Sequence, residues 1–237
     1  MTWEDCYRQY LLAQSTADCN LGRLSYTTVA ASFATATLED MQWLLSELAD
    51  RHKKSFAAIV LGHADFVPEH LFDALVKAAV YEPDPSDNRF FIEPAIRATS
   101  LFRVYVALLT YLETGTNREK AGAINALYWV NIPLSGWAMT KQQRESYSEP
   151  SLQLREDLEE VRGRVRHRLL QEFVANDDVG VQRSIIGQLS LVSEDYPETL
   201  QDVIPKAIDI ARNHADDYIR RRLENQLEEL EFRHNSV

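Results

Sequence analysis

Two stretches near the end of the chain decide the fold class: DVGVQRSIIGQLSLV at 178–192 and DDYIRRRLENQLEEL at 216–230. Each stretch begins with Asp and carries apolar residues three, seven, eleven and fourteen positions later. That spacing follows the 3.6-residue period of an α-helix, so each stretch is expected to form a helix with one apolar side. An Arg and a Gln-Leu pair also recur at matching positions, 38 residues apart.

A weaker third copy occupies 119–130, where Ala123, Ala126, Leu127 and Val130 take the apolar positions. Chance similarity among amphipathic helices is the alternative explanation, but the matching Asp, Arg and Gln-Leu residues favour a true repeat. A helix with one narrow apolar side buries that side only against a neighbour. The repeat therefore predicts an all-α fold, an α-α superhelix of stacked antiparallel helix pairs.

The rest of the chain fits this fold class. Only 8 Gly and 8 Pro occur in 237 residues, which argues against the many turns of a β-sandwich or barrel. We expect one helical-repeat domain over 1–237, with the repeat signal clearest over 116–232. The expected helices are 3–11, 38–48, 56–61, 68–80, 101–112, 116–131, 151–176, 178–193, 197–213 and 216–232. The segments expected to be irregular are 14–24, 82–89 and 132–150.

These repeats resemble the HEAT/armadillo class of helical repeats, in which a pattern such as Asp-x-x-Val-Arg-x-x-Ala-x-x-Ala-Leu is common. Asp216-x-x-Ile219-Arg220 and Ala123-x-x-Ala126-Leu127 match parts of it, whereas Gln182 stands where the Arg would be in the middle copy. The resemblance implies an α-solenoid fold, which usually provides a binding surface, and it implies no catalytic activity.

Composition restricts the partners. Lys and Arg number 25 against 36 Asp and Glu, so the net charge of −11 disfavours a general nucleic-acid binder. No apolar run approaches the ~18 residues of a membrane span. The acidic start lacks a signal-peptide pattern, and the only two cysteines, Cys6 and Cys19, suit a reducing compartment. We expect a cytoplasmic protein that binds no membrane.

One compact group of metal-ligating residue types occurs, made up of His63, Asp65, Glu69 and His70. It lacks the His-x-x-x-His or Cys-x-x-Cys spacing of zinc sites, and the preferred interpretation is a helix end at His63, a loop, and Glu69 near the start of the helix from Pro68. No nucleophile or phosphate-loop motif is present. We expect no metal, no cofactor and no catalytic residue, although a site assembled across the fold would escape this reasoning.

Two basic runs, 162–168 and 220–222, have the charge to contact phosphate. Acidic residues three or four positions away flank both runs. Such spacing favours ion pairs along one helix, so a solvated, salt-bridged helix face is the preferred interpretation.

The candidate partner-binding residues lie in two places. A loop as long as 132–150 is uncommon in a compact domain, and it carries aromatic and Arg side chains typical of interface hot spots. The helix from Pro197 offers polar residues suited to line a groove. The predicted residues are Trp137, Met139, Arg144 and Tyr147 from the loop, and Gln201, Asp202, Asp209 and Arg212 from the helix.

The sequence therefore predicts a non-catalytic scaffold or adaptor that binds another protein, possibly a basic one, through an α-solenoid groove. A sharper alternative is an inhibitor or immunity-type protein that neutralises a cationic partner, since the acidic charge would speed that encounter. An enzyme, or a helical-repeat protein that binds nucleic acid, are the remaining alternatives.

Overall fold

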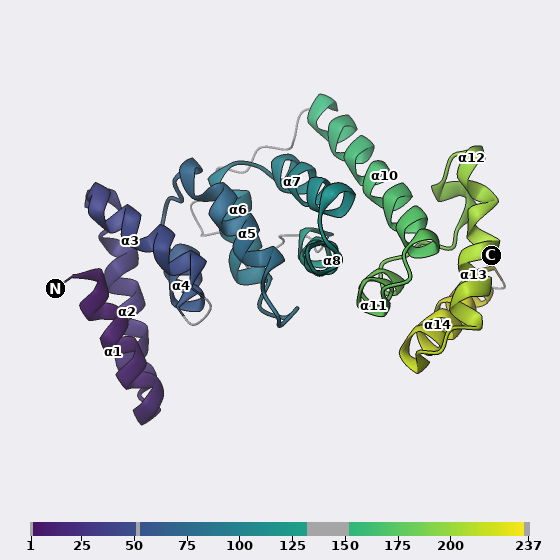
Figure 1. Ribbon diagram of the computed structural model, residues 1–237. Coiled ribbons are helices and arrows are strands. Elements are labelled where there is room, and N and C mark those ends of the chain that lie inside the picture. The colour runs from purple at the N-terminus through teal and green to yellow at the C-terminus, as the bar shows by residue number, and fades with distance from the viewer. Residues whose placement is uncertain (1, 51–52, 132–151, 235–237) are drawn as a thin grey trace. The chain divides into compact units, whose positions relative to one another are not determined.

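The computed structural model describes residues 2–50, 53–131 and 152–234 (Figure 1). The secondary structure of these residues is helical, with no strand among them, so the all-α prediction is confirmed. The chain forms two compact units: unit 1 holds 1–104 and 129–149, and unit 2 holds 105–128 and 150–237. A single domain over 1–237 stays a prediction. No helix of the described residues has the length and apolar content to cross a membrane.

Unit 1 is built from consecutive helices that pack as neighbours, α1 with α2, α3 with α4 and α5 with α6. This is the paired stacking that the repeat predicts. The helices are α1 (Trp3–Thr16), α2 (Cys19–Ala31), α3 (Leu38–Ala49), α4 (Lys54–His63), α5 (Phe72–Val80) and α6 (Arg89–Ala98), with short 3-10 helices η1 (Phe33–Thr35) and η2 (Glu69–Leu71).

Unit 2 contains most of α7 (Leu101–Thr114) and α8 (Asn117–Asn131), since the division between the units falls inside both helices. Here α10 packs against α11 and α13, and α14 packs against α11 and α13. The remaining elements are α10 (Leu152–Ala175), α11 (Val179–Ile186), η3 (Ser193–Asp195), α12 (Glu198–Gln201), α13 (Val203–Arg212) and α14 (Asp217–His234).

The repeated Asp residues begin equivalent helices. Asp178 Oδ1 accepts a hydrogen bond from the Val181 N–H at 2.9 Å, and Asp216 Oδ1 accepts one from the Ile219 N–H at 3.2 Å. Both are N-cap bonds, which satisfy backbone donors that the first helical turn leaves free. Val181 and Ile219 are fully buried, so the two copies match in their caps and in their packing.

The repeated Gln residues make equivalent bonds as well. Gln188 Nε2 donates to the Ile124 carbonyl at 2.6 Å, and Gln226 Nε2 donates to the Ile186 carbonyl at 2.8 Å. Ile124 and Ile186 occupy the same position in the first and middle copies, 62 residues apart. Each copy is therefore tied to the preceding one by the same side chain bonding the same backbone position.

Two local expectations were wrong at helix boundaries in unit 1. Residues 14–24, expected to be a loop, belong mostly to helices, because Ala17 and Asp18 alone connect α1 to α2. Ala17 makes this tight turn with a φ of 54°, the left-handed conformation that often ends a helix. Helix α6 was not expected, and its Pro94 is buried inside it.

In unit 2, two expected helices are shorter than their apolar pattern suggests. The helix expected over 178–193 ends at Ile186. The helix expected over 197–213 is interrupted at Asp202, which separates α12 from α13. Pro205 explains the second break, because it has no N–H to donate to the Gln201 carbonyl four residues earlier.

A buried ion pair joins α4 to the end of α5. Lys54 Nζ lies 2.7 Å from Glu82 Oε2, and both side chains are 7 % exposed. The same ammonium donates to the carbonyls of Ala78 and Tyr81, each at 3.3 Å. Asn88 Nδ2 donates to the neighbouring Ala79 carbonyl at 2.6 Å. The C-terminal carbonyls of α5 are thus bonded by side chains from outside that helix.

The end of α4 is held in the same way by α6. Arg97 Nη1 donates to the carbonyls of Leu61 and Gly62 at 3.2 and 3.1 Å, and Nη2 donates to the Ala64 carbonyl. Burial lowers the pKa of the Arg97 guanidinium, which the nearby Asp65 carboxylate partly offsets.

The repeat predicts a matched pair of stability losses. Gln226→Ala and Gln188→Ala each remove one side chain-to-carbonyl bond at an equivalent position, so each is expected to lower the free energy of unfolding by about 1 kcal/mol. Chemical denaturation measures both losses, with exposed Asn225→Ala as the control that changes little. A loss in only one of the two Gln variants contradicts their equivalence.

Lys54→Met should lower the free energy of unfolding far more than either Gln substitution does. It leaves Glu82 charged and buried without its partner and removes two donors from the end of α5, at an expected cost of about 3–5 kcal/mol. Lys77→Met, on the exposed side of α5, is the matched control and should stay within about 0.5 kcal/mol of the unmodified protein. Equal losses of unfolding free energy in Lys54→Met and Lys77→Met, measured by urea denaturation, would show that the ion pair does not stabilise the fold.

Candidate functional site: a pocket beside a surface of low charge

The turn between α1 and α2 brings these helices close enough to form one wall of a pocket. A Cβ placed on Gly22 of α2 would lie 3.5 Å from the Ala13 Cβ of α1, so small residues set the helix separation there. At the other end of the pair, Trp3 Nε1 donates to Ser32 Oγ at 2.9 Å. These two contacts fix the pair along its length.

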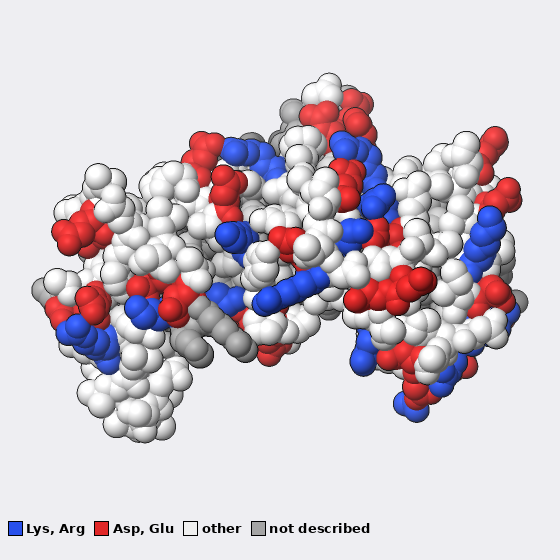
Figure 2. Space-filling view, viewed as in Figure 1, with Lys and Arg blue, Asp and Glu red and all other residues white. Residues whose placement is uncertain are grey.

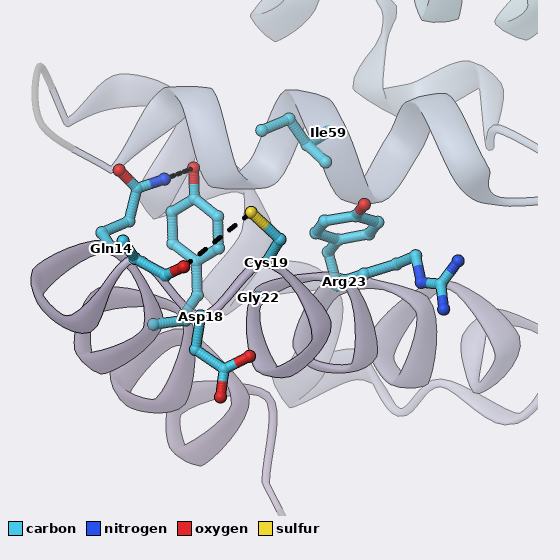
Figure 3. A pocket seen from close by; sticks show the side chains of 10 residues that line it. Gln14, Asp18, Cys19, Gly22, Arg23 and Ile59 are labelled. Atoms are coloured by element: carbon cyan, nitrogen blue, oxygen red, sulfur yellow. Dashed lines mark hydrogen bonds between the residues drawn. The ribbon is translucent and has the colours of Figure 1, made fainter.

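The pocket lies among α1, α2 and α4 and has a volume of about 380 Å³. In Figure 3, Gln14 and Arg23 lie at opposite ends, Cys19 lies between them, and Ile59 of α4 faces them. The volume is within the range of about 300–1,000 Å³ typical of ligand sites. The pocket is lined by Tyr10, Ala13, Gln14, Ala17, Asp18, Cys19, Gly22, Arg23, Tyr26 and Ile59.

Two tyrosines give the pocket aromatic sides. The Tyr10 ring packs on Phe56 with 5.0 Å between centroids, and burial raises the pKa of its phenol. Gln14 Nε2 donates to the Tyr10 hydroxyl at 2.8 Å, which leaves the Tyr10 proton able to donate elsewhere. Tyr26 packs on the His63 ring at 4.6 Å. Packing on these neighbours restrains both rings.

The two charged residues of the pocket differ in what they already bind. Asp18 Oδ1 caps α2 by accepting from the Asn20 and Leu21 N–H groups at 3.1 and 3.0 Å. Arg23 is exposed, and its side chain has no hydrogen bond, ion pair or ring contact with any described residue. The guanidinium of Arg23 is therefore the uncommitted charge of the pocket.

The segment that supplies most of the pocket lining is unusual for this protein. Only Asp18 and Arg23 are charged between residues 9 and 38, whereas 26 % of the whole chain is charged. On the face shown in Figure 2, the end where α1 meets α2, at lower left, carries no charged side chain. Four large apolar side chains in this segment are exposed: Leu11, Leu12, Leu24 and Leu38. We call residues 9–38 the low-charge surface.

Leu38 shares a helical three-to-four-residue spacing with Met41, Leu44, Leu45 and Leu48, which predicts one apolar side that includes Leu38. The structure corrects this prediction for Leu38. The structure buries Leu44 and Leu48, whereas Leu38 is 76 % exposed. Leu38 is the first residue of α3 and lies between the capping residues Thr37 and Asp40, at the N-terminal end of the helix.

The four residues of the candidate metal-binding group, His63, Asp65, Glu69 and His70, do not converge on one point. Glu69 forms an ion pair with Arg103, and His63 Nδ1 lies 2.9 Å from the Ile59 carbonyl. In the part of the chain that the structure describes, no group of three or more His, Cys, Asp or Glu residues is arranged to hold a metal ion. Asp65 and His70 are exposed.

The first basic run is largely paired with acids. Arg162 bonds Glu159 at 2.6 Å and Arg168 bonds Glu172 at 2.7 Å within α10. Arg164 and Arg166 reach Glu113 and Asp195, at 3.8 and 3.6 Å, on other elements of unit 2. In the second run, Arg220 and Arg221 both pair with Asp217. These contacts match the salt-bridged interpretation of both runs.

The predicted partner-binding residues of the C-terminal helix lie around α13. Asp202, Asp209 and Arg212 are exposed, whereas Gln201 is half-buried and donates to the Tyr196 carbonyl at 3.3 Å. Asp209 accepts a hydrogen bond from Asn213 Nδ2 at 2.9 Å. The other four predicted residues, Trp137, Met139, Arg144 and Tyr147, lie outside the described residues.

Sequence reasoning missed the pocket because it expected a loop over 14–24, the segment that provides much of the lining. Two signals were available. Asp18 is a good N-cap residue, and Leu21, Ser25 and Val29 continue at helical spacing after it.

Comparisons with protein-family models, with curated proteins and with solved structures found no match to this chain.

The two cysteines should differ sharply in reactivity. Cys19 is exposed at the pocket, whereas Cys6 is 1 % exposed and burial raises the pKa of its thiol. A thiol-reactive reagent should therefore modify one thiol per folded chain, and Cys19→Ser should abolish that reaction. Mass spectrometry locates the label. Rapid labelling of Cys6 in the folded protein would contradict the burial that the structure shows.

Proposed function

We propose that this protein is a non-catalytic scaffold that binds another protein. One observation carries the proposal: in a chain of net charge −11, residues 9–38 carry only two charged side chains, expose four leucines and provide most of a pocket that contains Tyr and Arg. Interface centres are depleted of charged residues and enriched in aromatic residues and Arg. Exposed apolar surface of this kind commonly marks an interaction site.

The architecture supports the same function. The equivalent caps and Gln-to-carbonyl bonds in unit 2 are what a HEAT/armadillo-like repeat would need, and such repeats stack into extended binding surfaces. Asp209 and Arg212 of α13, together with Asp202 just before it, are exposed and form a second proposed binding surface, in unit 2. A cytoplasmic location also forms part of the proposal, supported by two free cysteines.

Site-specific photo-crosslinking in the source cells tests this function. A photoreactive amino acid at Leu24, within the low-charge surface, should give a discrete adduct with one protein. Val179 is the matched control, because it is also an exposed apolar residue but follows two aspartates. A third position, Arg212, tests the α13 surface.

An adduct at Leu24 and none at Val179 supports the proposal. Adducts with nucleic acid, or no adduct at either Leu24 or Arg212, would overturn it.

A second candidate function has its own supporting observation: the net charge of −11 favours an inhibitor of a cationic protein. In that case the association rate with the crosslinked partner should fall steeply as salt is raised from 50 to 500 mM.

A further inference from the structure

The pocket among α1, α2 and α4 indicates the chemistry of its ligand. Resting on the proposed protein-binding function, we propose that this pocket takes a partner segment in which an apolar side chain lies next to a carboxylate, as in a Phe-Glu or Leu-Asp sequence.

The apolar part of this assignment comes from the lining. Tyr10, Tyr26 and Ile59 present two rings and a branched aliphatic chain, and the small residues Ala13 and Gly22 complete the lining where the two helices approach closely. Burying an apolar side chain against such groups is favourable because it removes apolar surface from water. A volume of about 380 Å³ accommodates one large side chain together with neighbouring backbone.

The carboxylate part comes from Arg23. The other described arginines of unit 1 are engaged: Arg8 pairs with Glu4 at 2.8 Å, Arg97 and Arg103 are bonded as described above, and Arg89 lies over the rings of Phe90 and Trp129. Arg23 has no such contact. A planar guanidinium binds a carboxylate through two parallel hydrogen bonds, so an acidic side chain is its natural partner.

The charge distribution explains why an acidic segment can approach a protein of net charge −11. Between residues 9 and 38 the only carboxylate belongs to Asp18, and that carboxylate already accepts two backbone hydrogen bonds as the cap of α2. A segment with so few carboxylates repels an acidic ligand less than the acid-rich segments of the chain do. At the far end of the pocket, the Tyr10 hydroxyl proton is available to a peptide carbonyl.

Synthetic peptides test the assignment on the full chain. The probes are acetyl-Gly-Gly-Phe-Glu-Gly-Gly-amide and its Phe-Gln, Phe-Lys and Gly-Glu counterparts, titrated into ¹⁵N-labelled protein. The Phe-Glu peptide should shift the amide signals of Ala13, Gly22 and Tyr26. It should also bind about tenfold more tightly than the Phe-Gln peptide, the size expected for one charge-assisted hydrogen bond.

Arg23→Gln should remove the preference for Phe-Glu over Phe-Gln, and it should leave the fold intact because Arg23 has no partner to lose. Arg8→Gln, which changes an exposed arginine of α1 outside the pocket, is the matched control and should keep the preference. As an independent readout, the Phe-Glu peptide should slow alkylation of Cys19 several-fold, because Cys19 lies between the two ends of the pocket.

Three outcomes would overturn the assignment: tighter binding of the Phe-Lys peptide, a preference that survives Arg23→Gln, or shifts confined to residues away from the pocket. These results are separable from failure of the proposed function. A protein adduct at Leu24 combined with peptide failure rejects only the ligand chemistry. Peptide binding without any adduct at Leu24 or Arg212 rejects the scaffold function and leaves the pocket chemistry standing.

Discussion

The constraint on which both units depend is that carbonyl groups at helix C-termini need hydrogen-bond donors. In this glycine-poor chain, several of those donors are long side chains from neighbouring helices. Lys54 bonds the end of α5, Arg97 the end of α4, Gln226 the end of α11, and Gln182 Nε2 bonds the Phe173 carbonyl near the end of α10. Each bond satisfies a carbonyl near a helix end and joins that helix to another one, so secondary and tertiary structure are stabilised together.

This constraint also positions the pocket. Arg97 binds the carbonyls that end α4, and α4 contributes Ile59 to the pocket and His63 to the ring of Tyr26. The opposite wall depends on a different solution, because α1 ends through the left-handed Ala17. The pocket is therefore bounded by two helices whose C-terminal ends are held differently: α4 by the Arg97 guanidinium, and α1 by the left-handed backbone of Ala17.

Charge is distributed in two distinct ways. The basic run of α10 is matched by acids in unit 2, and Lys54 and Glu82 are paired in the interior of unit 1. The low-charge surface of residues 9–38 has neither kind of pairing and exposes leucines. Ion pairs within a unit engage basic side chains such as those of α10, whereas the side chain of Arg23, beside apolar groups and without a partner among the described residues, is suited to specific recognition.

The sequence by itself determined the all-α class, most helix starts and the repeated positions, because caps such as Thr37 with Asp40 and a 3.6-residue apolar period act over one or two turns. Only the tertiary structure decided where α1 stops, that α4 lies across from it, and that Arg97 bonds three carbonyls while the Arg23 side chain has no partner among the described residues. Those properties depend on residues tens of positions apart, and helical periodicity carries no information about which helix ends meet.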